Sequence, residues 1–122
     1  MKSDYAAWRP RLAEANDPAF WPIEAIDQLL TEGNAQFWSD GDAALVTRVV
    51  AYPGGAVAVE AVAGAGTMEG LVESIAPQVE QWAKTEGYSH LLIAGRAGWS
   101  RVHKTWRHHQ SILLKELADG QH

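Results

Sequence analysis

A short glycine-containing segment in the middle of the chain has the composition of a phosphate cradle. Gly64, Ala65, Gly66 and Thr67 follow an apolar, strand-like run and come directly before a run with helical spacing. The start of a helix presents unpaired N–H groups and a partial positive charge, and glycine lets the backbone approach an anion closely. The segment could therefore hold a diphosphate, or it could only turn the chain.

The charges around this segment oppose an anion. No Lys or Arg lies between Arg48 and Lys84, whereas four glutamates do: Glu60, Glu69, Glu73 and Glu80. A carboxylate and a phosphate about 4 Å apart repel each other by roughly 1 to 4 kcal/mol, depending on the dielectric. The cations of a diphosphate site would have to come from the C-terminal part of the chain, where the candidates are Arg96, Arg101 and Lys104.

Few residues could transfer a proton. Glu60, on the strand-like run before the glycines, could act as a base through water, and a solvent-facing strand position explains it equally. His103, His108 and His109 could exchange protons near neutral pH, or they could lie on the surface. No Ser-His-Asp order, zinc-type spacing or P-loop is present, and neighbouring histidines on a strand point to opposite faces. We predict no metal site.

The segment "GRAGWSRVHKTWRHHQ" interleaves four cations with two tryptophans and three histidines. Such a mixture could grip a phosphate backbone and stack a base. The footprint is small, and a net charge of -5 opposes non-specific binding to nucleic acid. A solvated helix with Trp99 packed into the core is the favoured interpretation, and nucleic acid is not an expected partner.

The pattern of apolar residues predicts helices first and strands next. Helical spacing runs over residues 8–16 and stops before Pro18, and a second helix starts near Pro22 and ends at Gly33. Residues 35–64 are rich in β-branched and aromatic types, and two turn sequences, "DGD" and "PGG", break them into three antiparallel strands.

The second half of the chain alternates between helix and strand. Residues 68–87 have helical spacing with a break expected at Pro77, which cannot donate a bond to the Glu73 carbonyl. "SHLLIAG" reads as a central strand buried on both faces, residues 95–106 as a short helix and residues 108–117 as a last strand. The predicted order is α-α-β-β-β-α-β-α-β, an α+β domain around one mixed sheet.

The bulk composition fits one globular domain over residues 1–122. The chain is 47% hydrophobic and 20% charged, and no apolar run reaches the roughly 18 residues that span a bilayer, so we expect no membrane association. The absence of cysteine and the acids and proline in "MKSDYAAWRPRL" favour a cytoplasmic protein that is not exported. The sequence does not indicate an oligomeric state.

Two sets of phrases carry a resemblance to known proteins. "AGAGT" before the long helix, with "GYSHLLIAGRAGW" after it, resembles the GNAT acyltransferase superfamily. "EGNAQFWSDGDAALVTRVVAYPGG", "VEQWAKTEGYSHLLIAGRAGWSRV" and "LLKEL" are similar to small GNAT-like proteins encoded by tailed phages and prophages. The likeness covers roughly residues 25–117.

The resemblance implies a GNAT-like fold and transfer of an acetyl group from acetyl-CoA to an amine. It places Gly64, Ala65, Gly66 and Thr67 on the diphosphate. Arg96 and Arg101, candidates because the loop itself lacks cations, are the further cofactor-binding residues that we expect. Ala61 stands where the superfamily pattern has Arg or Gln, and residues 96–109 hold no tyrosine for the usual acid. A non-catalytic interaction module, attached to a virion or to another phage protein, therefore stays open as the alternative.

Overall fold

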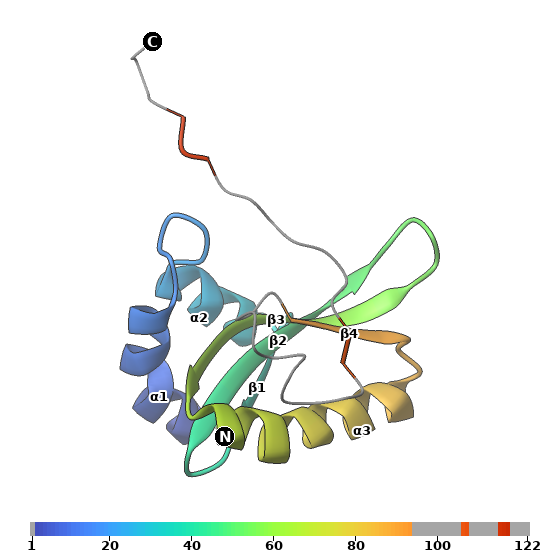
Figure 1. Ribbon diagram of the computed structural model, residues 1–122. Coiled ribbons are helices and arrows are strands. Elements are labelled where there is room, and N and C mark those ends of the chain that lie inside the picture. The colour runs from blue at the N-terminus through green and yellow to red at the C-terminus, as the bar shows by residue number, and fades with distance from the viewer. Residues whose placement is uncertain (1, 94–105, 108–114, 118–122) are drawn as a thin grey trace.

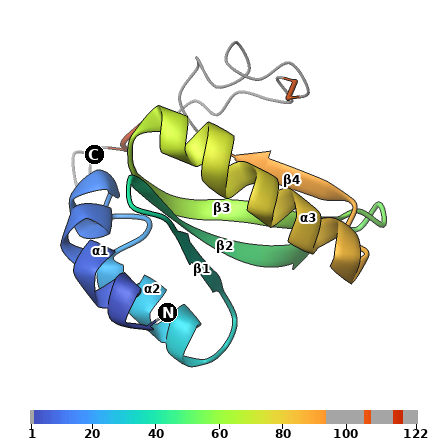
Figure 2. The same ribbon diagram turned by 90° about the horizontal axis from the view of Figure 1, so that it is seen from below.

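The computed structural model describes residues 2–93, 106–107 and 115–117. Four strands form one sheet in the order β1-β2-β3-β4. β1 (Gln36–Ser39), β2 (Ala43–Ala51) and β3 (Val57–Gly66) are antiparallel neighbours, and β4 (His90–Ile93) pairs in parallel with β3. The helices cover the two faces: α1 and α2 lie on one side of the sheet and α3 on the other (Figures 1 and 2).

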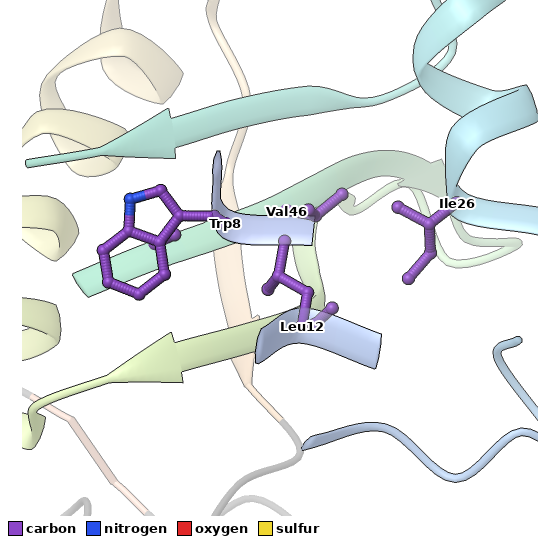
Figure 3. Packing of buried hydrophobic residues seen from close by; sticks show 6 residues of the cluster. Trp8, Leu12, Ile26 and Val46 are labelled. Carbon is purple, nitrogen blue, oxygen red and sulfur yellow. The ribbon is translucent and has the colours of Figure 1, made fainter. Parts of the chain in front are cut away.

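The helices α1 (Lys2–Ala15) and α2 (Ile23–Thr31) close the first core. Trp8 and Leu12 of α1, Ile26 of α2 and Val46 of β2 belong to one buried cluster, in which Leu12 and Ile26 point toward Val46 (Figure 3). Arg9 ties the two helices together, because its guanidinium donates to both carboxylate oxygens of Asp27 at 2.6 to 3.1 Å. α1 also packs on β3, the strand that lines the candidate site.

The opposite face holds a second core beneath a helix that changes its winding. η1 (Gly70–Ile75) is a π-helical turn that continues into α3 (Ala76–Glu86), with Pro77 in the first turn of α3. The N–H of Ala76 donates to the carbonyl of Leu71, five residues earlier. Pro77 has no N–H to donate to the Glu73 carbonyl, and the wider π-helical turn accommodates this missing hydrogen bond at the place where the sequence predicts a break. Ile75 and Val79 then pack on Leu45 and Val59.

The first seven elements confirm the predicted order, and three details of the prediction are wrong. α1 begins at Lys2 rather than near residue 8, and it runs through Pro10 because Trp8 and Leu12 anchor it on the sheet. β4 is an edge strand among the described strands, and its residues are half-buried or exposed rather than enclosed on both faces. Residues 64–66 belong to β3 and not to a loop.

The last two predicted elements lie almost entirely outside the described residues. Residues 106–107 and 115–117 have neither helical nor strand structure. Trp106 packs against Val72 and Ala76. In the described part of the chain, every helix is too short or too polar to cross a membrane.

Candidate active site

β3 has two halves that differ in their neighbours. The inner half, residues 57–61, pairs with β2 on one side, and its residues 58–61 pair with β4 on the other. The outer half, residues 62–66, pairs with β2 alone among the described strands. Figure 2 shows β3 continuing past the described part of β4. Among the described residues, no strand pairs with this backbone edge of the outer half, so the edge can face a ligand.

A β-bulge marks the point where the two halves meet. Val46 of β2 faces Ala63 and Thr47 faces Ala61, so Val62 is an extra residue with no partner in β2. A bulge leaves the extra residue out of the ladder and bends the strand. The last described pair between β3 and β4 is Ala61 with Ile93, directly before the bulge. The described pairing with β4 and the bulge thus meet at one place in β3.

A cleft of about 490 Å³ runs along the outer half of β3. This volume lies within the range of small-molecule sites. The cleft reaches from the end of α1, across the β3 edge, to the start of the helix that follows. Its lining comprises Arg11, Glu14, Ala15, Asn16, Leu45, residues 61–66, Met68, Leu71 and Ile93.

The glycine segment lies at one end of this cleft and is held tightly by β2. Gly66 has φ +101°, and a Cβ placed there would lie 2.2 Å from the Asp42 carbonyl oxygen. The N–H of Thr67 donates to the same carbonyl at 3.0 Å. Gly66 is therefore required by the close approach of β2, whatever the segment binds. An acidic substitution at Gly66 would disturb the fold together with any binding.

Thr67 caps the helix that follows. Its Oγ1 accepts a hydrogen bond from the N–H of Gly70 at 3.0 Å, and its carbonyl accepts from Leu71 at 3.1 Å. The N–H groups of Met68 and Glu69 have no acceptor among the described residues. The first turn of a helix leaves such donors for a side chain, water or a ligand. Of these two donors, that of Met68 belongs to a lining residue of the cleft, and Glu69 follows it directly in the chain.

The charged residues that line the cleft come from α1, where the sequence predicted no site residue. Arg11 lies with its guanidinium carbon 4.2 Å from the centre of the Trp8 ring, and both Arg11 and Glu14 line the cleft. Helical spacing places them beside Trp8 and Leu12, the residues that face β3. That spacing was the available signal, but using it requires knowing that α1 packs on β3.

Glu60 lies outside the cleft and is paired elsewhere. Its Oε1 accepts from Arg48 Nε at 2.9 Å and lies 2.8 Å from the second guanidinium nitrogen, and the Tyr52 hydroxyl donates to Oε2 at 3.4 Å. Arg48 in turn lies over the Trp21 ring. Glu60 also lies four residues before Gly64, roughly 13 Å along an extended strand. Glu60 is not positioned beside residues 64–67.

The remaining predicted residues cannot be placed in the site. Arg96, Arg101 and Lys104 lie outside the described residues, as do His103, His108 and His109. Within the described part, no group of three or more His, Asp or Glu side chains could hold a metal ion. The described cation of the cleft is Arg11 rather than a residue of the C-terminal segment.

The cleft fits the chemistry of an acyl-CoA. A diphosphate needs donors and a cation, which the Met68 and Glu69 N–H groups and Arg11 can supply. The arm that joins the diphosphate to the thioester carries amide groups, which can pair with the open edge of a strand. The carboxylate of Glu69 faces solvent in the first helical turn, where it complements the helix dipole.

Solved structures of acetyltransferases share this fold. A ribosomal-protein-alanine N-acetyltransferase from Brucella melitensis biovar Abortus 2308 aligns with a TM-score of 0.60 at 14% identity, covering 95% of this chain and 94% of that one. A Trypanosoma brucei acetyltransferase aligns with a TM-score of 0.64 at 10% identity, covering 96% of this chain and 95% of that one. The α+β, GNAT-like fold predicted from the sequence is confirmed.

At this level of identity the likeness establishes the fold and not the reaction. No protein-family model matches the sequence, and no curated protein matches it.

Proposed function

We propose that the chain binds acetyl-CoA along the outer half of β3 and transfers the acetyl group to an amine. The observation that carries this proposal is the cleft itself, which follows the outer half of β3 from the bulge to a helix start, where two N–H groups have no acceptor among the described residues. The fold shared with two acetyltransferases supports it.

Each part of the cleft has a role in this proposal. The N–H groups of Met68 and Glu69, the Thr67 hydroxyl proton and Arg11 bind the diphosphate. The open strand edge orients the arm, and Ile93 and Leu45 exclude water around the reacting end. Bound acetyl-CoA supplies a thioester, whose carbonyl carbon gains a bond to the amine nitrogen and loses its bond to sulfur, while the amine proton ends on the thiolate.

Glu14 replaces Glu60 as the candidate base. It is the one carboxylate among the described residues that line the cleft, and no described cation lies within 4 Å of it. It can accept the amine proton directly or through water. Its charge also favours a cationic amine over an anionic acceptor at this end of the cleft.

Calorimetric titration tests the cofactor. We expect saturable binding of acetyl-CoA, and of desulfo-CoA as a second ligand, with a dissociation constant on the order of micromolar. Arg11→Gln should weaken binding roughly three- to tenfold because a charge-assisted contact is lost. Lys84→Gln is the matched control, since Lys84 lies on α3 beside Glu80 and outside the cleft. The absence of heat up to millimolar ligand would contradict the proposal.

Release of the CoA thiol in an amine screen tests the reaction. We expect Glu14→Gln to lower turnover while the affinity for acetyl-CoA stays the same.

A second function, binding without transfer, is favoured by one observation. Glu60 is paired with Arg48 outside the cleft, so Glu14 is the single candidate base among the described lining residues. Acetyl-CoA binding with no thiol release for any amine would support that alternative. A search for protein partners, phage structural proteins included, would follow.

A further inference from the structure

A second cavity lies beneath the cleft, between the sheet and α3. It shares three lining residues with the cleft, namely Leu45, Ala61 and Ile93. Ala61 and Ile93 form the last described pair between β3 and β4, next to the bulge. The cavity therefore adjoins the part of the cleft in which the proposed function places the thioester.

The walls of this cavity are apolar. Val79 and Ala76 come from α3, Leu91 and Leu92 from β4, and Trp106 completes the lining. Thr47 is the one polar side chain among its described lining residues. The Thr47 hydroxyl already accepts from Trp38 Nε1 at 3.0 Å and donates to Gln36 Oε1 at 2.7 Å.

A hydrocarbon group is a better occupant of this cavity than a water molecule. Its volume is about 10 Å³, close to the smallest that holds one water molecule, and a buried water needs two to four polar partners. The engaged Thr47 hydroxyl cannot supply them. A methyl or methylene group, by contrast, would bury apolar surface there without losing a hydrogen bond.

We propose that this apolar cavity receives the end of the acyl chain and sets the length of the acyl group that the protein accepts. The inference rests on the proposed function. The volume admits acetyl and about one further carbon, so propionyl-CoA binds at least as well as acetyl-CoA, and butyryl-CoA binds less well. Val79 limits the depth of the cavity from α3.

Two variants change this depth in opposite directions. Val79→Ala removes two methyl groups from the wall, and the affinity ratio of butyryl-CoA to acetyl-CoA should rise roughly four- to tenfold, because each buried methylene is worth about fourfold. Ala76→Val fills the cavity, and the ratio of propionyl-CoA to acetyl-CoA should fall by a similar factor. Val72→Ala is the matched control: Val72 is 3% exposed and Val79 4%, and Val72 lines neither cavity.

The experiment is calorimetric titration of the full chain and each variant with CoA, acetyl-CoA, propionyl-CoA and butyryl-CoA, after thermal melting has shown that each variant folds. Opposite shifts of the ratios in the two variants, with no shift in Val72→Ala, support the inference. Binding of all four ligands with the same ratios in every protein overturns the inference and leaves the proposed function intact. If no CoA compound binds at all, both are overturned. Should Val79→Ala fail to fold, Ala76→Val decides alone.

Discussion

The inner and outer halves of β3 have similar small, apolar compositions, yet they differ in backbone pairing. Residues 58–61 are held from both sides, and their alternating side chains fill the cores. Residues 62–66 are held from one side by described strands, and a cleft lies along the other. The comparison indicates that the position of the cleft follows the backbone pairing of β3 and its bulge, more than any distinctive side chain.

Substitution of Gly66, at the tightly packed end of the outer half of β3, should have the largest effect on stability. Gly66→Ala should lower the free energy of unfolding by about 3 kcal/mol or more, because a Cβ would lie 2.2 Å from the Asp42 oxygen. Gly55→Ala is the control: φ is +99° there and nothing lies within 4 Å, so we expect a cost of about 1 kcal/mol from backbone strain alone. Urea denaturation measures both. Equal costs would show that β2 does not enforce the glycine at the end of the outer half.

Thr67 joins the outer half of β3 to the helix, and its substitution tests whether this junction serves folding, ligand binding or both. Thr67→Ala should lower the free energy of unfolding by about 1 kcal/mol, since the Gly70 N–H loses its acceptor. It should also weaken acetyl-CoA binding, because the hydroxyl proton no longer reaches a phosphate. Thr67→Ser keeps the hydroxyl and should restore both properties. Weaker folding with unchanged affinity would leave Thr67 as a cap only.

The hydrogen bonds that join α1 to α2 give a smaller effect, which depends on pH. Hydrogen bonds from Arg9 lower the pKa of Asp27, and burial raises the pKa of Tyr5, whose hydroxyl donates to Asp27 at 2.6 Å. A carboxyl with a lowered folded-state pKa stabilises the fold above its unfolded value of about 3.9, and this contribution is lost as the pH falls through the folded pKa.

Asp27→Asn should therefore lower the free energy of unfolding by about 1 kcal/mol at pH 7, a value discounted for the partial exposure of the pair. The difference from the wild type should shrink as the pH falls below about 4. Urea denaturation at a series of pH values measures it. A difference that stays constant from pH 7 to pH 2 would mean that the Asp27 charge does not contribute.

Local sequence signals predicted the elements well. Pro22 and Gly33 bound α2, the two turn sequences separate the first three strands, and Pro77 disturbs the helix where the missing N–H requires it. Each of these signals acts within one turn or one hairpin. Gly64 and Gly66 misled the prediction because glycine is typical of turns, whereas here it lets β3 continue against the backbone of β2.

The site itself depends on contacts that the sequence does not reveal locally. Arg11 and Glu14 reach the cleft because α1 packs on β3, about 50 residues later in the chain. The bulge at Val62 depends on the register between two strands, and no residue type near it is diagnostic. The sequence indicated residues 64–67 as the candidate anion site, but it did not indicate that Arg11 lines the same cleft.

Substitution of Glu60, in the inner half of β3, should have the smallest effect on stability. Its consequences should be the opposite of those of substituting Glu14, beside the outer half. Glu60→Gln should lower the free energy of unfolding by about 0.5 kcal/mol, because its ion pair with Arg48 is partly exposed. Acetyl-CoA affinity and thiol release should not change, since Glu60 lies outside the cleft. Glu14→Gln should do the reverse, with normal stability and lower turnover. If Glu60→Gln instead abolished turnover at normal stability, the acceptor would have to approach from the Arg48 side of the sheet, and the outer half of β3 would no longer be the reacting surface.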